Sequence, residues 1–112
     1  MSEAMSMEIE PAELHRRIDS GESIVIIDCR TEAERDIACL ENTIHVPMAE
    51  LGAKLEELRE HDESHVVVHC HHGVRSLQVT HALRNEGFEQ AQSLAGGIDR
   101  WSMEINPSIP RY

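Results

Sequence analysis

Residues 66–76 read Val66-Val67-Val68-His69-Cys70-His71-His72-Gly73-Val74-Arg75-Ser76, and this stretch decides the fold to expect. Three consecutive valines predict a strand that is buried on both faces. The residues that follow carry a helical pattern that ends at Gly87, which predicts a helix over 74–86. Cys70 therefore lies between the end of a buried strand and the start of a helix.

A cysteine in this position is favoured as a thiolate. The unpaired N–H groups and the partial positive charge of a helix N-terminus stabilise anions, and both lower the pKa of a thiol. Gly73 allows a tight loop to fold back around the sulfur. Arg75 can bind an oxyanion through two parallel hydrogen bonds. We therefore predict that Cys70 is a nucleophile and that Arg75 binds an anionic substrate.

Strand and helix patterns alternate along the rest of the chain. The expected strands cover residues 5–9, 23–28, 44–46, 66–69 and 92–94. The expected helices cover residues 11–21, 31–36, 51–58, 74–86 and 98–103. This alternation predicts an α/β fold with a mainly parallel five-stranded sheet and helices on both faces. Ligands in such folds bind at the carboxyl ends of the strands, where Asp28 and Cys70 each end an apolar run.

The length of 112 residues predicts a single domain, residues 1–112, with a core over about residues 6–103 and an extended tail over 104–112. A net charge of −11 argues against nucleic acid and against an anionic membrane as partners, since both require a basic face. Lys54 is the only lysine, so a positive site must be built from arginines and backbone dipoles.

The beginning of the chain carries no basic segment followed by an apolar one, so we expect no secretory signal. No apolar stretch approaches the length that spans a bilayer. The three cysteines are an odd number without paired spacing, which does not resemble a disulfide framework. These features predict a cytoplasmic protein.

The histidines around Cys70 raise the question of a metal site. Adjacent residues rarely all turn toward one ion, and no spaced second pair of ligands exists, so we expect no metal and no cofactor. We expect His71 and His72 at the mouth of the loop, where protonation would add positive charge. His69 is expected to be a strand residue with a hydrogen-bonded imidazole. Ser76 either caps the helix or donates a hydrogen bond to the cysteine.

Three motifs, in this order along the chain, resemble the rhodanese family. An apolar strand that ends Asp-x-Arg and is followed by a glutamate matches residues 26–30 with Glu34. The loop Cys-x-x-Gly-x-Arg-Ser matches residues 70–76, and Leu-x-Gly-Gly-Ile-x-x-Trp matches residues 94–101. The similarity covers residues 6–103, nearly the whole chain.

The resemblance implies a sulfurtransferase that carries sulfur as a persulfide on Cys70. The sulfur would come from a small anionic donor such as thiosulfate and pass to a thiophilic acceptor, which is cyanide, a thiol or a protein. Asp28 and Arg30 are implied to brace the loop through charge pairs. The residues implied to bind the substrate are Arg75, His71, His72, Gly73, Val74 and Ser76.

The sequence departs from the family pattern at residues 38–43, where Cys39 stands in place of a usual histidine. This position raises the question of whether Cys39 resolves a persulfide on Cys70 as a disulfide. An inert thiol is the expected role for Cys39. The same expectation holds for Cys29, whose side chain should point away from the face that carries Asp28.

Two other functions stay open at this point. A cysteine phosphatase or arsenate reductase has a similar strand, loop and helix, but it places five residues between cysteine and arginine, whereas only four separate Cys70 from Arg75. A non-catalytic interaction module is the second alternative. The tail over 106–112 also resembles the end of rhodanese domains fused to adenylyltransferases, which pass sulfur to a carrier protein; the acceptor here would then be a protein.

Overall fold

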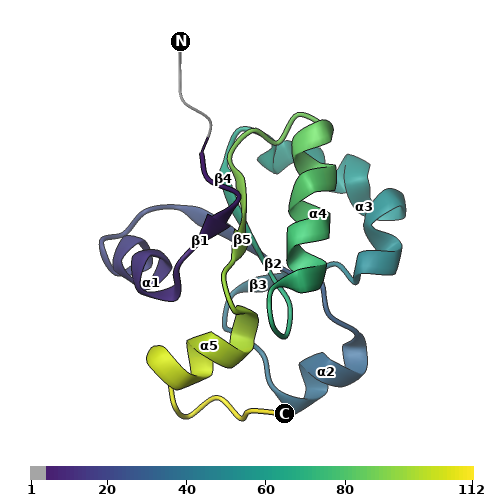
Figure 1. Ribbon diagram of the computed structural model, residues 1–112. Helices are drawn as coiled ribbons and strands as arrows, with labels where there is room; N and C mark the ends of the chain where they lie inside the picture. Colours follow the sequence, from purple (N-terminus) through teal and green to yellow (C-terminus); the bar gives the residue numbers. More distant parts are fainter. Residues whose placement is uncertain (1–4) are drawn as a thin grey trace.

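The computed structural model describes residues 5–112. Strands and helices alternate along the chain, as the sequence predicts (Figure 1). The elements are β1 (Glu8–Ile9), α1 (Pro11–Asp19), β2 (Ile24–Asp28), α2 (Glu32–Ile37), β3 (Thr43–His45), the 3-10 turn η1 (Met48–Glu50), α3 (Leu51–Leu58), the 3-10 turn η2 (Arg59–His61), β4 (His65–His69), α4 (Val74–Asn85), β5 (Ala91–Leu94) and α5 (Gly97–Glu104).

The five strands form one sheet in the order β1-β5-β4-β2-β3. Every pairing between neighbouring strands is parallel, so the predicted parallel five-stranded sheet is confirmed. β4 occupies the centre and pairs with β2 from Ile24 opposite His65 to Asp28 opposite His69. β1 has only two residues and is shorter than expected, because only Glu8 and Ile9 reach β5.

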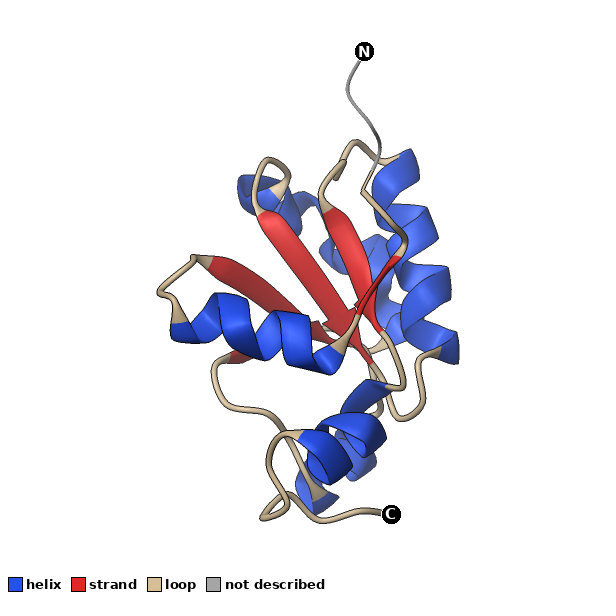
Figure 2. Ribbon diagram, turned by 60° about the vertical axis from the view of Figure 1, so that its left-hand side comes forward, coloured by secondary structure: helices blue, strands red, loops and turns tan. Residues whose placement is uncertain are grey.

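Helices cover both faces of the sheet, which confirms the predicted layers (Figure 2). Successive side chains of a strand point to opposite faces. Val66 and Val68 accordingly pack in a core beneath α3 and α4, whereas Val67 packs in a second core beneath α1 and α5. All three valines are fully buried, as a strand covered on both faces requires. No helix within residues 5–112 combines the length and the apolar character needed to cross a membrane.

The carboxyl ends of β2 and β4 meet at one edge of the sheet, and α2 begins just beyond β2. The Thr31 hydroxyl accepts a hydrogen bond from the Glu34 N–H at 3.3 Å, while the Glu34 carboxylate accepts from the Thr31 N–H. This capping box starts the helix at Glu32. α2 buries none of its residues, so its cap and the polar contacts of its side chains fix its place at this edge.

The turn at Gly96 and Gly97 lies directly against the loop that follows β4. The Ile98 N–H donates to the Cys70 carbonyl at 2.9 Å, and the Asp99 N–H donates to the His71 carbonyl at 3.1 Å. A Cβ atom on Gly97 would lie 2.5 Å from both of those carbonyl oxygens, and Gly97 has a φ of +62°. Only glycine fits this position without displacing the loop.

We expect Gly97→Ala to destabilise the fold by about 3 kcal/mol or more, because it adds a steric clash to the cost of a left-handed backbone. Gly21→Ala is the matched control, since Gly21 also has a positive φ but no atom within 4 Å of its Cβ position. Gly21→Ala should lower the free energy of unfolding by only about 1 kcal/mol. Urea unfolding monitored by circular dichroism measures both values. Equal losses in the two variants would show that the contact with the loop is unimportant.

Candidate active site

The loop between β4 and α4 folds back on the sulfur of Cys70. Gly73 makes the reversal with a left-handed φ of 101° and is the N-cap of α4. Its N–H donates to Cys70 Sγ at 3.1 Å, and the Ser76 N–H donates to the same sulfur at 3.3 Å. Cys70 is only 1% exposed. The sulfur therefore occupies a nest of backbone donors at the start of a twelve-residue helix.

The side chain of Ser76 completes this nest. Its Oγ lies 3.3 Å from Cys70 Sγ and 2.7 Å from the hydroxyl of Ser93 on β5. Gly73 holds the N-cap position, so the two roles considered for Ser76 are resolved in favour of a contact with the cysteine. Val74 is 69% exposed, and its part in binding a substrate stays a prediction.

Cys29 lies beside Cys70, because the residues before them pair in the ladder as Asp28 opposite His69. The neighbouring Cys29 thiol is the largest influence that lowers the pKa of Cys70, and the donors from Ser76 and Gly73 add to it against the opposing effect of burial. The neighbouring Cys70 and burial raise the pKa of Cys29. The negative charge therefore resides on Cys70, and Cys29 keeps its proton.

Arg75 is held by a partner within the chain. Its two terminal nitrogens donate to the two carboxylate oxygens of Glu34 at 2.6 and 2.9 Å. The hydroxyl of Tyr112 donates to Glu34 at 2.7 Å. The bonds from Arg75, and then the one from Tyr112, hold the pKa of Glu34 well below its usual range. The guanidinium that was predicted to bind the anionic sulfur donor is thus occupied by a carboxylate of the chain. The binding of a sulfur donor by Arg75 stays a prediction.

Asp28 and Arg30 form a fully buried ion pair. Arg30 Nε and Nη2 donate to the two Asp28 oxygens at 2.9 and 2.8 Å, and Arg35 adds a bond at 3.1 Å. Burial alone would raise the pKa of Asp28, but the hydrogen bonds from Arg30 outweigh it and lower the pKa to about 2. Arg30 also donates to the Ala38 carbonyl at 2.7 Å and to Tyr112 at 3.0 Å. The pair therefore braces α2 and the tail rather than the Cys70 loop itself.

The expected hydrogen bonding of His69 was wrong. Its ring is fully buried, and neither ring nitrogen has a hydrogen-bond partner within the described part of the chain. The strand register places it opposite Asp28, whose oxygens are already taken by Arg30 and Arg35, and the nearest approach is 3.9 Å. Burial lowers the pKa of His69 to about 4, so the ring is neutral at physiological pH.

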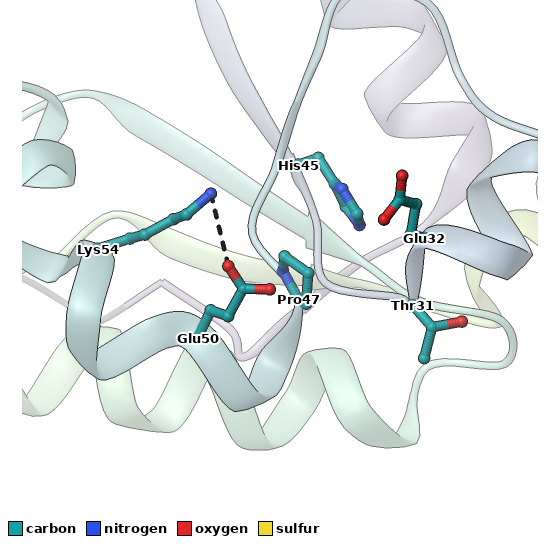
Figure 3. A pocket seen from close by; sticks show the side chains of 6 residues that line it. All are labelled: Thr31, Glu32, His45, Pro47, Glu50 and Lys54. Carbon is teal, nitrogen blue, oxygen red and sulfur yellow. Dashed lines mark ion pairs between the residues drawn. The ribbon is translucent and has the colours of Figure 1, made fainter.

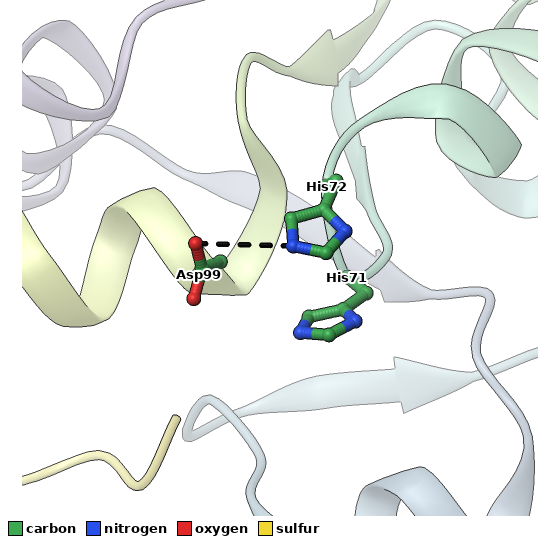
Figure 4. Close-up of side chains that lie close together, drawn as sticks. All are labelled: His71, His72 and Asp99. Atoms are coloured by element: carbon green, nitrogen blue, oxygen red, sulfur yellow. Dashed lines mark ion pairs between the residues drawn. The ribbon is translucent and has the colours of Figure 1, made fainter. Parts of the chain in front are cut away.

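The side chains of His71 and His72 lie at the mouth of the loop, beside Asp99 of α5 (Figure 4). The His71 ring stacks between His72 and Tyr112, with centroid distances of 3.8 Å on each side. The ligand atoms of both histidines and Asp99 lie within 4.8 Å of one another. Arg111 already bonds the Asp99 carboxylate at 2.9 Å. Cys70 and His69 lie outside this group of possible ligand atoms.

Cys39 lies away from the nest. It is exposed after α2 and lines a pocket with Ile26 and Trp101, on the side of the sheet opposite to Cys70. A second pocket lies beside the carboxyl edge and contains no residue of the loop over 70–76 (Figure 3). Its lining residues are Thr31, Glu32, His45, Pro47, Glu50 and Lys54.

Sequence reasoning missed the roles of Cys29, Asp99 and Tyr112 at this site. Tyr112 reaches Arg30 across 82 positions of sequence, and no local pattern records such a contact. The alternation of side chains along a strand predicts that Cys29 points away from the face that carries Asp28, but not which residue it meets there. Since β2 pairs with β4 in register, a side chain on that face of residue 29 must lie beside residue 70.

These features define a class: parallel α/β domains that hold a cysteine sulfur in a nest of N–H donors between a central strand and a helix N-terminus. The model of the Rhodanese-like domain matches residues 10–104, and the chain belongs to the rhodanese family. The resemblance found in the sequence is thereby confirmed.

Relatives and solved structures agree with this assignment. A rhodanese-related protein from Thermoplasma volcanium aligns with a TM-score of 0.81 and 26% identity, covering 96% of this chain and all of that chain. The provisionally assigned sulfur carrier protein YrkF of Bacillus subtilis is 30% identical over 85% of this chain. The provisionally assigned adenylyltransferase/sulfurtransferase MoeZ of Mycobacterium tuberculosis is 30% identical over 93% of it. The chain spans 50% and 26% of the lengths of these two relatives.

The low pKa of Cys70 gives a testable pH dependence. Alkylation follows the thiolate, so the rate for Cys70 should stay high below neutral pH, where an ordinary thiol is protonated. Ser76→Ala should raise the pKa by about one unit, since a hydrogen bond to a charged group contributes about 1.5 kcal/mol. The rate of iodoacetamide labelling of the Cys70 peptide against pH measures this shift. Ser102→Ala removes another buried hydroxyl and is the control; identical profiles for the two variants would contradict the prediction.

Proposed function

We propose that this protein is a sulfurtransferase that carries a sulfane sulfur as a persulfide on Cys70. The observation that carries the proposal is the nest itself, in which Gly73 and Ser76 aim two N–H groups at the sulfur. Further N–H groups in the first turn of α4 are left unpaired by helix geometry. Such donors stabilise a thiolate and equally the negative outer sulfur of a persulfide.

The donor is an anion with a labile sulfur–sulfur bond, such as thiosulfate. The Cys70 thiolate attacks the outer sulfur of thiosulfate, a new S–S bond forms, and the old one breaks with its electron pair leaving on sulfite. A nucleophilic acceptor then attacks the outer sulfur of the persulfide. Cys70 leaves as the thiolate in this second step, and its low pKa makes it a good leaving group.

The size of the loop supports sulfur rather than phosphate as the transferred group. Four residues separate Cys70 from Arg75, which makes a smaller cradle than five residues would. Membership in the rhodanese family and the name of the Mycobacterium tuberculosis relative, an adenylyltransferase/sulfurtransferase, also support sulfur as the transferred group. We further propose that the acceptor class includes proteins, which the relatives named as a sulfur carrier and as an adenylyltransferase/sulfurtransferase support.

Cys70→Ala should abolish the formation of thiocyanate from thiosulfate and cyanide, because it removes the only proposed carrier of sulfur. Cys39→Ala is the matched control and should keep its activity, since Cys39 lies on the opposite side of the sheet. Circular dichroism checks that both variants fold. Activity that persists in Cys70→Ala would overturn the assignment.

Arg75 and Glu34 should change the affinity for the donor in opposite directions. Arg75→Ala should raise the KM for thiosulfate by about tenfold with a smaller effect on kcat, since a charged hydrogen bond contributes about 1.5 kcal/mol. Glu34→Gln should lower this KM, because the anion no longer competes with a carboxylate for Arg75. Arg75→Lys keeps the charge and should fall between wild type and Arg75→Ala. Steady-state kinetics with varied thiosulfate tests all three; a KM for Arg75→Ala equal to that of wild type would exclude the proposed role.

A further inference from the structure

Cys29 is a buried thiol that the proposed transfer reaction does not use. It follows β2 directly, and Cys70 follows β4, with the residues before them paired as Asp28 opposite His69. The Cys29 N–H continues the ladder with a bond of 3.1 Å to the His69 carbonyl. Cys29 and Cys70 therefore occupy facing positions on neighbouring strands.

Both side chains point to the same face of the sheet, into the core beneath α3 and α4. Neighbouring strands lie about 4.8 Å apart, and disulfides join residues whose Cα atoms lie about 4.4 to 6.8 Å apart. The facing positions thus have the backbone separation that a disulfide needs.

Burial makes Cys29 the thiol best placed to reach the inner sulfur of a persulfide on Cys70. Cys29 and Cys70 are each 1% exposed, so a thiol from solvent could reach Cys70 Sγ only from the loop side, where the outer sulfur of the persulfide would lie. The outer sulfur, in contrast, would extend among the loop N–H groups and toward the mouth at His71. Attack by Cys29 is therefore directed to the inner sulfur, and the intramolecular thiol acts at a high effective concentration.

We propose that Cys29 is a resolving thiol that converts the Cys70 persulfide into a Cys29–Cys70 disulfide and releases the sulfane sulfur as hydrogen sulfide. This inference rests on the proposed function, which supplies the persulfide. The Cys29 sulfur bonds to Cys70 Sγ, the bond to the outer sulfur breaks, and that sulfur leaves with the electron pair as hydrosulfide. The negative outer sulfur of the persulfide takes the proton of Cys29, which frees the Cys29 thiolate for the attack and lets the outer sulfur leave as hydrosulfide. The two cysteine sulfurs are oxidised and the sulfane sulfur is reduced, so the step needs no external oxidant.

The disulfide changes what the protein can do next. Cys70 can no longer accept sulfur from a donor, so transfer stops when no acceptor has taken the outer sulfur in time. A dithiol reductant restores both thiols by exchange. Release of sulfide through Cys29 therefore competes with the delivery of the sulfane sulfur from Cys70 to an acceptor.

The test uses the full chain with Cys39→Ser, which leaves Cys29 and Cys70 as the only two thiols. This protein and the same protein with Cys29→Ser are charged with thiosulfate, desalted to remove donor and sulfite, and incubated without acceptor. Sulfide release, intact mass and peptide mapping are followed over time. Serine is close in size to cysteine and keeps a hydroxyl donor beside Cys70, so the variant is a matched control for folding and for the nest.

With Cys29 present, we expect one sulfide per chain, a final mass two hydrogens below the reduced protein, and a peptide cross-link between Cys29 and Cys70 that dithiothreitol removes. With Cys29→Ser, we expect the mass of one added sulfur to persist and sulfide release to fall by about tenfold or more. Equal sulfide release from the two proteins would overturn the inference.

The remaining outcomes separate this inference from the proposed function. A persistent gain of one sulfur on Cys70 in both proteins supports the sulfurtransferase and overturns the resolving role. A gain of sulfur that moves to Cys29 without sulfide release shows attack on the outer sulfur and also overturns it. If neither protein gains sulfur or releases sulfide while both remain folded by circular dichroism, the persulfide itself is excluded and both proposals fall.

Discussion

The site depends on one close backbone contact, between the Cys70 loop and the turn at Gly96 and Gly97. Two N–H groups from the start of α5 bond the carbonyls of Cys70 and His71, which leaves the N–H groups on the other side of the loop free to face the sulfur. Gly73 itself lies against this turn, because a Cβ on it would be 3.2 Å from the Gly96 nitrogen. The loop keeps its curvature because the α5 turn supports it from outside.

Two of the ion pairs of this acidic chain connect the segment after β2 to that loop. The buried Asp28–Arg30 pair fixes the segment that leads into α2, and α2 carries Glu34 to Arg75. Tyr112 joins the two pairs, since its hydroxyl accepts from Arg30 and donates to Glu34. The positive charge at the mouth is therefore balanced within the chain, and an anionic donor must compete with Glu34 for it.

Much of the fold follows from the sequence because its signals are local. The valines of β4 require a strand covered on both faces, Thr31 and Glu34 carry a capping box, and Pro11 stands at the first turn of α1. His69 shows where local reasoning fails. A hydrogen bond from its ring required a free oxygen of Asp28, and the Asp28 oxygens already accept hydrogen bonds from Arg30 and Arg35.

The sequence by itself determined the parallel α/β fold, the family, and Cys70 as the residue at the strand–helix junction, because each rests on periodicity or on a motif of near neighbours. Only the tertiary structure decided what surrounds that sulfur. Cys29 comes beside Cys70 through the register of two parallel strands, and Tyr112 comes over His71 through the path of the tail. Contacts between residues some 40 positions apart depend on the register of paired strands and on the path of the C-terminal tail across the edge of the sheet. Neither can be predicted from a local sequence pattern.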